Sequence, residues 1–355
     1  MHGDRTGVFA DSDLRRFRRM ALSWYDQNRR DLPWRRTRDA YAIWVSEIML
    51  QQTRVAAVLE HYRVFLDRFP NVATLAAASE DDVLAAWSGL GYYRRARMMH
   101  RCAGEILARH GGRFPERAAA WRELPGIGRY TAAAIASIAF GEASAVVDGN
   151  VERVLQRIGG RSLRAAESWA RAEELLSRSR PGDFNQAMME LGATVCLPGE
   201  PRCAVCPVRS LCATGIRELR AEGSERSALR TKAVPRQKRE IWCWLERRNG
   251  SVRLVQRAQK APLMAGMWEL PQFGEVPGEA ASVGKWRTFR HSITVTDYTV
   301  HVLRAFETRM RAIPKNGAPD RSGPARRGKW VAIGEISRLP ITGLTRKILK
   351  ADGII

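Results

Sequence analysis

Apolar residues in the first half of the chain recur every three or four positions, the spacing of one face of a helix. The clearest case follows Asp39, a residue type that caps helices, and places Trp44 and Ile48 on the same face. Further stretches with this period lie near 55–69, 82–109, 129–140, 145–158, 167–177 and 184–195. Gln52 interrupts the apolar face, so we expect a break between two helices there. The pattern predicts an all-helical first domain.

The pattern changes to strand-like alternation after about residue 240. Two apolar runs, 241–245 and 252–255, flank Asn249-Gly250, the dipeptide that a type I′ hairpin turn prefers. Residues 294–306 alternate like a further strand, and 344–349 predict a closing helix. These elements predict a smaller α+β domain.

Two polar segments separate or interrupt these domains. Residues 214–237 are basic and predict a linker, and 311–329 are rich in Arg, Pro and Gly and predict a loop. We therefore expect a multidomain chain, with an all-helical domain over 13–213 and an α+β domain over 238–355.

The charge balance points to a polyanionic partner. The chain has 355 residues, with 59 Lys and Arg against 37 Asp and Glu, a net charge of +22. An excess of this size is typical of nucleic-acid-binding proteins. No run approaches the roughly 18 apolar residues of a membrane span, and the N-terminus lacks an apolar signal region. We expect a cytoplasmic monomer, nucleoid-associated if bacterial, with no membrane partner.

Four cysteines lie close together near the end of the helical half. Cys196, Cys203, Cys206 and Cys212 are separated by six, two and five residues. Disulfides are improbable in the cytoplasm, whereas four thiolates suit either zinc or an iron–sulfur cluster. The cysteine count alone leaves both metals open.

A glycine-containing turn precedes one of the predicted helices. Gly126 and Gly128 lie in Leu-Pro-Gly-Ile-Gly at 124–128, where the absence of a Cβ permits close backbone approach. The amides of the following helix N-terminus favour a phosphate. Asp148 follows Gly128 by twenty residues. Because DNA repels a carboxylate, Asp148 does not serve DNA affinity in so basic a chain. We interpret it as a residue that carries out chemistry at a DNA backbone.

Together, the turn, Asp148 and the four cysteines resemble the helix-hairpin-helix superfamily of DNA glycosylases. Three features are similar to its MutY-type adenine DNA glycosylases: the segment 44–53, Gly-Met-Trp-Glu-Leu-Pro at 266–271, and Tyr130 where endonuclease III enzymes have a lysine. The resemblance runs from about Arg15 to the last residue. It implies base excision repair of double-stranded DNA by removal of adenine mispaired with 8-oxoguanine or guanine. The cysteine spacing resembles the terminal loop of endonuclease III enzymes, which implies a [4Fe–4S] cluster.

The chemistry of this reaction requires two carboxyl groups in different environments. Adenine leaves readily only when a ring nitrogen is protonated, and the sugar then becomes cationic, so an acid and an anion are needed. Glu47 lies among apolar residues, and burial would raise its pKa and keep it protonated. We expect Glu47 to protonate adenine and later activate water. We expect Asp148 to stay ionised and to stabilise the sugar or bond to it transiently, with Asn150 holding its carboxylate.

Tyr130 predicts the reaction subtype. A lyase forms a Schiff base through an amine, which a tyrosine cannot do. We expect hydrolysis only, which leaves an abasic site.

The resemblance also implies contacts to the bases. Adenine must leave the stack to be reached, and its expected pocket residues are Arg30, Trp34, Arg35, Leu50 and Gln186. The expected contacts to DNA are Gln52, Leu90, Tyr92, Gly126 and Gly128, of which Gln52 and Tyr92 are expected to fill the gap beside the opposite base.

The C-terminal part resembles the Nudix-like lesion-reading domain of this family. Glu269, Glu275 and Glu279 occur without the glutamate-rich run that holds magnesium in a Nudix hydrolase, so we expect binding without hydrolysis. The segment 288–292 resembles the Phe-Ser-His loop that contacts the oxidised guanine, through Phe289, Arg290, His291 and Ser292. Arg290 stands where serine is expected. Either Arg290 or Ser292 supplies the contact, or the lesion is read less selectively.

Three other functions compete with this interpretation. They are a non-catalytic basic DNA-binding scaffold, a bifunctional endonuclease III-like enzyme for pyrimidine lesions, and a zinc-stabilised nucleic-acid adaptor. Glu47 and Asp148 argue against the first, and Tyr130 against the second.

Overall fold

The computed structural model describes residues 9–220, 236–275, 285–305 and 328–355. Contacts divide the chain into two compact units. One comprises 1–62, 71–76 and 101–231, and the other comprises 63–70, 77–100 and 232–355. This grouping assigns part of the helical half to the same unit as the sheet. The predicted domain bounds, 13–213 and 238–355, remain a prediction.

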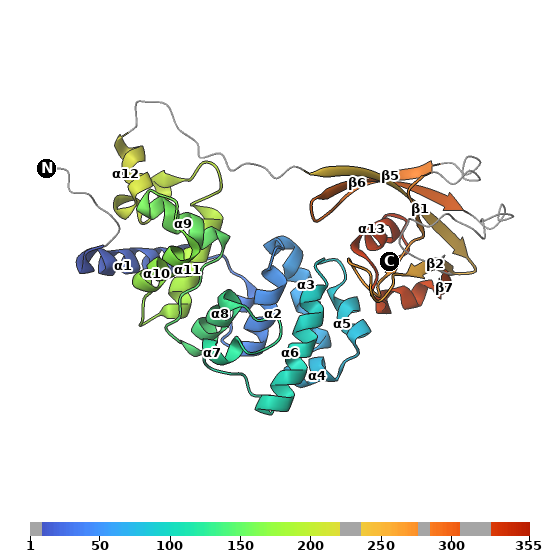
Figure 1. Cartoon of the computed structure of the whole chain (residues 1–355), viewed down its shortest axis with the longest axis horizontal. Helices are drawn as coiled ribbons and strands as arrows, with labels where there is room; N and C mark the ends of the chain where they lie inside the picture. Colours follow the sequence, from blue (N-terminus) through green and yellow to red (C-terminus); the bar gives the residue numbers. More distant parts are fainter. Residues whose placement is uncertain (1–8, 221–235, 276–284, 306–327) are drawn as a thin grey trace. The chain divides into compact units, whose positions relative to one another are not determined.

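The first unit is helical, as the apolar period predicts (Figure 1). Its elements are α1 (Asp11–Asn28), η1 (Pro33–Arg35), α2 (Ala40–Leu50), α7 (Ala118–Trp121), α8 (Arg129–Phe140), α9 (Gly149–Gly159), α10 (Ala165–Leu175), α11 (Pro181–Thr194), η2 (Cys203–Val205), η3 (Arg209–Leu211) and α12 (Ala213–Arg220). Helices α3 (Val55–Arg68), α4 (Val72–Ala77) and α6 (Arg94–His110) contain residues of both units, and α5 (Glu80–Trp87) belongs to the second.

Helix α2 is buried from Ala40 to Met49, and only its last residue, Leu50, is partly exposed. The Asp39 carboxylate accepts a hydrogen bond from the Tyr41 amide at 2.9 Å, which confirms the predicted cap. The helix ends at Leu50, and α3 begins at Val55, so the predicted break at Gln52 is also confirmed. The mid-helix residues of α2, Glu47 among them, therefore lie in the interior.

Helix α8 packs closely against α2 and α11 because its buried face is made mainly of alanine. Gly182 of α11 lies directly against the backbone of α8, where a Cβ would come within 2.5 Å of the Ser137 carbonyl oxygen. The Asn185 side chain, one turn further on, accepts from the Val146 amide and donates to Ser144 O and Ser137 Oγ. These contacts fix the segment that leads to Asp148.

The described part of the second unit consists of β1 (Gln237–Arg248), β2 (Ser251–Gln256), β3 (Trp268–Glu269), β4 (Gln272–Phe273), β5 (Lys285–Ile293), β6 (Thr296–Ala305), β7 (Lys329–Ala332), η6 (Ile333–Arg338) and α13 (Gly343–Ala351). Within these described residues the strands form a seven-stranded sheet with the order β3-β2-β1-β6-β5, in which β4 pairs with β1 and β7 with β2. Strands β1 and β6 are parallel, and the other pairs are antiparallel.

The predicted hairpin and closing helix are both confirmed. Asn249 and Gly250 have φ of 47° and 70°, as a type I′ turn requires, and they join β1 to β2. The apolar face of α13 packs through Ile348 and Leu349 into the core that Leu245 and Val302 form in the sheet.

The two segments predicted as irregular are described only in part. The predicted linker 214–237 begins in α12, because that segment packs against α9 and η3, and 221–235 lie outside the described residues. Most of the predicted loop 311–329 also lies outside them. Among the described residues, no helix combines the length and apolar character needed to cross a membrane.

Candidate active site

A cavity of about 620 Å³ lies in the first unit, among η1, α2, α8, α11 and the N-terminus of α9. All four predicted catalytic residues line it, namely Glu47, Tyr130, Asp148 and Asn150. So do the five predicted adenine-pocket residues, Arg30, Trp34, Arg35, Leu50 and Gln186, together with Gln52. The structure thus brings together residues that are distant in the sequence.

Glu47 has the environment of an acid that holds its proton. Its side chain comes from the middle of α2 and is 6% exposed. The pKa of Glu47 is raised to about 7, mainly by burial and also by the nearby Asp148 charge, against the lowering effect of Tyr130 and Arg35. The predicted burial of Glu47 is therefore confirmed, and a large fraction of this carboxyl is neutral near pH 7.

Asp148 has a contrasting environment at the N-terminus of α9. Its carboxylate accepts hydrogen bonds from the Val151 amide at 2.7 Å and from Asn150 Nδ2 at 3.2 Å. A helix N-terminus favours negative charge, so the cavity places an anion beside a neutral acid. The predicted contact between Asn150 and Asp148 is present.

Tyr130 lies at the start of α8, with its hydroxyl 3.1 Å from Met189 Sδ. Burial raises the pKa of Tyr130 well above its usual value, and the carboxyl groups of Glu47 and Asp148 raise it further. Tyr130 is therefore a neutral hydrogen-bond donor. Lysine is absent from the described residues that line the cavity.

A buried carboxylate, which sequence reasoning missed, anchors the arginines of the cavity wall. The Glu190 side chain on α11 is fully buried and bonds Arg30 Nε at 2.7 Å and Arg35 at 2.7 Å. Burial raises the pKa of Glu190, but hydrogen bonds from Arg30 and Arg35 outweigh this and lower it to about 2. Its position one helical turn after Gln186 is the signal that could have found it.

Trp34 and Gln186 occupy different positions around the cavity. The Trp34 side chain is 6% exposed, and its ring packs edge-on against Tyr62, with centroids 5.2 Å apart. Gln186 is partly exposed, and its side chain makes no hydrogen bond to another described residue, so its amide is available to a ligand.

Two of the residues predicted to lie beside the opposite base have unusual backbones. Gln52 and Tyr92 have φ of 54° and 47°, a conformation that costs a residue with a side chain about 1 kcal/mol or more. Both are exposed. Leu90 is only 6% exposed, because it packs in the core, so the expectation of a direct DNA contact from its side chain is not supported.

The predicted hairpin exposes its glycines. Gly126 has φ of 78° and Gly128 precedes α8, and both are exposed. Gly128 provides no side-chain cap, so the first amides of α8 have no side-chain acceptor from the residue before the helix. Such amides form an anion site.

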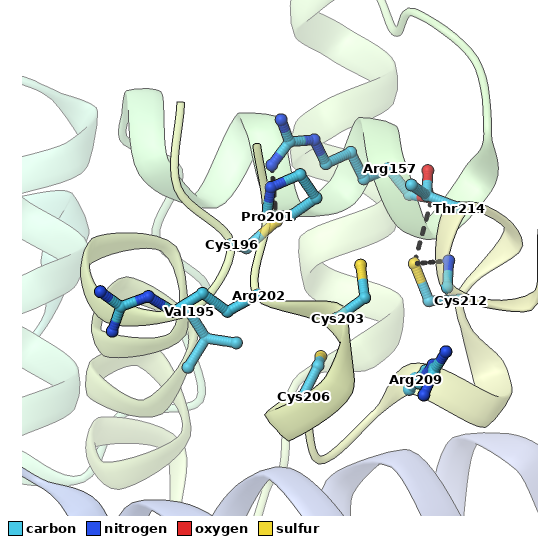
Figure 2. A pocket seen from close by; sticks show the side chains of 11 residues that line it. Arg157, Val195, Cys196, Pro201, Arg202, Cys203, Cys206, Arg209, Cys212 and Thr214 are labelled. Atoms are coloured by element: carbon cyan, nitrogen blue, oxygen red, sulfur yellow. Dashed lines mark hydrogen bonds between the residues drawn. The ribbon is translucent and has the colours of Figure 1, made fainter. Parts of the chain in front are cut away.

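The four cysteines line a second, smaller pocket in the same unit, as Figure 2 shows. Arg157 donates to Cys196 Sγ at 3.3 Å, and the Gly215 amide donates to Cys212 Sγ at 3.5 Å. The cysteines are not disulfide-bonded. Within the described ranges, no three His, Cys, Asp or Glu side chains are arranged to hold a single metal ion.

Hydrogen bonds connect this cysteine loop to the first cavity. Arg153 on α9 donates from Nε to Cys196 O at 2.8 Å and from its terminal nitrogen to Asn150 Oδ1 at 2.9 Å. Asn150 in turn bonds Asp148. Gly192 of α11 permits this arrangement, because a Cβ there would lie 2.7 Å from Asn150 Cβ.

The segment predicted as a lesion-reading loop is part of strand β5, which corrects that expectation. Pairing of residues 285–293 with β6 extends it into the sheet. Phe289 faces the core and is 8% exposed, so it offers little surface to DNA. Arg290 is exposed, and Ser292 Oγ donates to Asp297 at 2.6 Å. Burial and the Lys347 charge lower the pKa of His291.

Comparisons with known proteins agree with this architecture. Residues 45–178 match the family described as HhH-GPD superfamily base excision DNA repair protein, and residues 241–351 match the NUDIX domain family. The chain belongs to the helix-hairpin-helix base excision repair superfamily. This confirms the predicted family and the order of a helical domain followed by a Nudix-like α+β domain.

Curated relatives of this superfamily member include two adenine DNA glycosylases. That of Homo sapiens is 41% identical over 329 residues, covering 77% of this chain and 60% of the relative. That of Arabidopsis thaliana is 39% identical over 311 residues, covering 76% of this chain and 49% of the relative. The chain thus spans about half to three fifths of these relatives.

Solved structures share the helical fold. A thermostable thymine-DNA glycosylase is 30% identical with a TM-score of 0.55, covering 58% of this chain and 98% of that one. A trapped endonuclease III–DNA covalent intermediate is 20% identical with a TM-score of 0.52, covering 60% of this chain and all of that one.

Proposed function

We propose that this protein is a monofunctional adenine DNA glycosylase that acts on adenine opposite 8-oxoguanine or guanine in double-stranded DNA. One observation carries the proposal, namely that Glu47 and Asp148 line the same cavity in contrasting environments. The adenine DNA glycosylase relatives and the net charge of +22 support adenine as the base and DNA as the partner.

The two carboxyl groups divide the reaction between them. Glu47 donates its proton to a ring nitrogen of the flipped adenine, which leaves with the electrons of the N-glycosidic bond. The Asp148 carboxylate stabilises the cationic sugar. Glu47, now ionised, accepts a proton from the attacking water, whose oxygen bonds to the sugar carbon. The enzyme returns to its starting state, and the DNA carries an abasic site.

The cavity wall is suited to an adenine outside the helix. Trp34 contributes an aromatic surface, Leu50 an apolar one, and Gln186 a free amide that pairs with the adenine edge. Arg30 and Arg35 lie in the wall beside them. The Tyr130 hydroxyl interacts with the Glu47 carboxyl through a hydrogen bond and helps to orient it.

The opposite base is contacted by separate elements. Gln52 and Tyr92 occupy the gap beside it, which their exposed left-handed backbones support. Gly126 and Gly128 hold the DNA backbone through amides. Arg290, rather than Ser292, reads the opposite purine, because Ser292 is engaged with Asp297. The Nudix-like domain binds without hydrolysis, since its sequence lacks the glutamate-rich run that holds magnesium in a Nudix hydrolase.

The cysteine pocket fits a [4Fe–4S] cluster. Cys196, Cys203, Cys206 and Cys212 line one pocket, with nitrogen donors to two sulfurs. Four cysteine thiolates are the usual ligands of such a cluster, and the spacing of these cysteines resembles the terminal loop of endonuclease III enzymes. These four residues would hold the cluster, which would supply structural rigidity to the loop.

The metal assignment is tested by metal analysis of the purified protein. We expect a brown protein with roughly four irons per chain. A colourless protein that contains zinc would overturn the cluster.

A single-turnover assay tests the activity. The duplexes carry adenine opposite 8-oxoguanine, guanine or thymine, and thymine opposite guanine, the last because of the thymine-DNA glycosylase similarity. We expect adenine release from the first two only, no covalent adduct trapped by borohydride, and loss of release in Asp148→Asn. Because Asn also caps helices, that variant keeps α9 intact. Absence of adenine release would identify a non-catalytic DNA-binding protein, and a trapped adduct would overturn the monofunctional assignment.

A further inference from the structure

A buried charge cluster in the cavity wall joins Glu190 to two of the adenine-pocket residues, Arg30 and Arg35. Glu190 Oε1 accepts from the Arg30 amide at 3.2 Å and from Arg30 Nε at 2.7 Å, and Oε2 accepts from Arg30 at 2.8 Å and from Arg35 at 2.7 Å. The Arg35 side chain also donates to the Arg30 carbonyl at 3.2 Å. Together these bonds close a clamp around the segment that carries Trp34.

We propose that Glu190 is a positioning residue for the glycosylase reaction, which holds Arg30 and Arg35 in the cavity wall and offsets their charge so that Glu47 keeps its proton. The inference rests on the proposed function. Glu190 contacts neither the acid nor the reacting atoms, and acts through the two arginines.

The geometric part of the argument concerns Trp34. One carboxylate bonds the residues four positions before and one position after it, so the path of the intervening backbone is fixed from both ends. Glu190 itself lies on buried α11, which packs against α1, α8 and α9. The hydrogen bonds from Glu190 therefore fix the position of Trp34, the aromatic residue of the cavity wall, relative to helix α11.

The electrostatic part concerns the charges that face Glu47. Tyr130 from α8, Asp148 at the start of α9 and Arg35 from η1 act on it directly. Arg30, Arg54 and Glu190 complete the charged groups of the described cavity lining. Arg35 favours the ionised form of Glu47, but a carboxylate 2.7 Å away offsets most of that positive charge. Without Glu190, the guanidinium charges would act on Glu47 undiminished.

The test compares Glu190→Gln with the wild type in two measurements. The first is the single-turnover rate on an adenine:8-oxoguanine duplex as a function of pH. The second is the carboxyl ¹³C NMR titration of Glu47 in the DNA-free protein, assigned with Glu47→Gln. In Glu190→Gln, we expect the basic limb of the rate–pH profile and the titration curve of Glu47 to move about one pH unit lower. Such a shift corresponds to about a tenfold loss of the protonated form of Glu47 at high pH. Unmoved curves would overturn the proposal.

Two further variants separate charge from structure. Glu190→Gln/Arg35→Gln removes both charges of one pair, so we expect the Glu47 titration to return toward its wild-type position; a failure to return would contradict the electrostatic offset. Should Glu190→Gln not fold, Glu190→Asp replaces it. Because Asp keeps the charge but shortens the clamp, we expect an unmoved titration with a slower rate, and a shifted titration would overturn the proposal.

Asp183→Asn is the matched control. Asp183 lies on the same helix and pairs with Arg180 at 2.8 Å, outside the cavity lining, so both curves should remain in place. The NMR titration needs no turnover. A wild type that releases no adenine would therefore overturn the proposed function alone, whereas the titration would still decide the role of Glu190.

Discussion

Glu47, in the middle of α2, and Asp148, at the first turn of α9, line one cavity, and the charge of Asp148 raises the pKa of Glu47. The effect adds to that of burial, which is the larger cause. The same pair therefore provides an anion for a cationic sugar and helps to keep the acid protonated near neutral pH.

The pH dependence of base release follows from this pair. The pKa of Glu47 is about 7, and the acid form is the reactive one, so we expect the single-turnover rate to fall as pH rises through 7. Glu47→Gln removes the proton donor and should lower the rate by about 10²-fold or more. A Glu47→Gln variant that retains the wild-type rate and pH profile would rule out this residue as the acid.

The same burial predicts a stability cost. The pKa of Glu47 is raised from 4.5 to about 7 in the folded protein, so the folded state holds more protons than the unfolded chain between these values. Stability therefore falls as pH rises through this window, by about 3 kcal/mol when the window is passed. We expect Glu47→Gln to unfold at a higher temperature than the wild type at pH 8, with a smaller difference at pH 5. Equal differences at both pH values would contradict the pKa assignment.

The close approach of α9 and α11 gives a steric prediction. In Gly192→Ala, the new Cβ would meet Asn150 Cβ at 2.7 Å, so Asn150 must move away from Asp148. We expect a loss of stability of about 1–3 kcal/mol and slower adenine release, measured by chemical denaturation and single-turnover assay. Gly159→Ala on α9 is the control, because a Cβ there meets nothing within 4 Å, and it should be neutral or stabilising.

The exposed Arg290 predicts weakened discrimination between opposite bases. A guanidinium only donates hydrogen bonds, and guanine offers it acceptors at O6 and N7, whereas 8-oxoguanine carries a hydrogen at N7. Arg290→Ser, which restores a group that both donates and accepts, should raise the ratio of the rates opposite 8-oxoguanine and guanine. His291→Ala should lower that ratio. An unchanged ratio in both variants would exclude this strand from lesion reading.

Much of this architecture follows from local sequence signals. The cap at Asp39, the break at Gln52 and the turn at Asn249-Gly250 depend on neighbouring residues only, and each is present. Tyr130, Asp148 and several residues of segment 44–53, which carried part of the family resemblance, line one cavity. Their convergence could be expected from the resemblance alone, since no periodicity indicates which helices pack together.

The remaining differences concern tertiary contacts. Glu190 was missed because its partners, Arg30 and Arg35, come from a distant segment. Leu90 and Phe289 are buried in hydrophobic cores. The sequence could not predict this, because a motif match gives no information about the direction in which a side chain points. Pairing with β6 makes residues 288–292 a strand rather than a loop.

Ser88, just after α5, is 2% exposed and donates to Ile341 O at 2.7 Å while accepting from Arg346 Nε at 2.9 Å. Truncation of the chain before the sheet would remove the hydrogen bonds of this hydroxyl to Ile341 and Arg346 and expose the buried side chain. A shortened protein that lacks the sheet would therefore lose solubility or helix stability for reasons unrelated to lesion reading. A lower activity of such a protein would not by itself show that the missing part recognises the lesion.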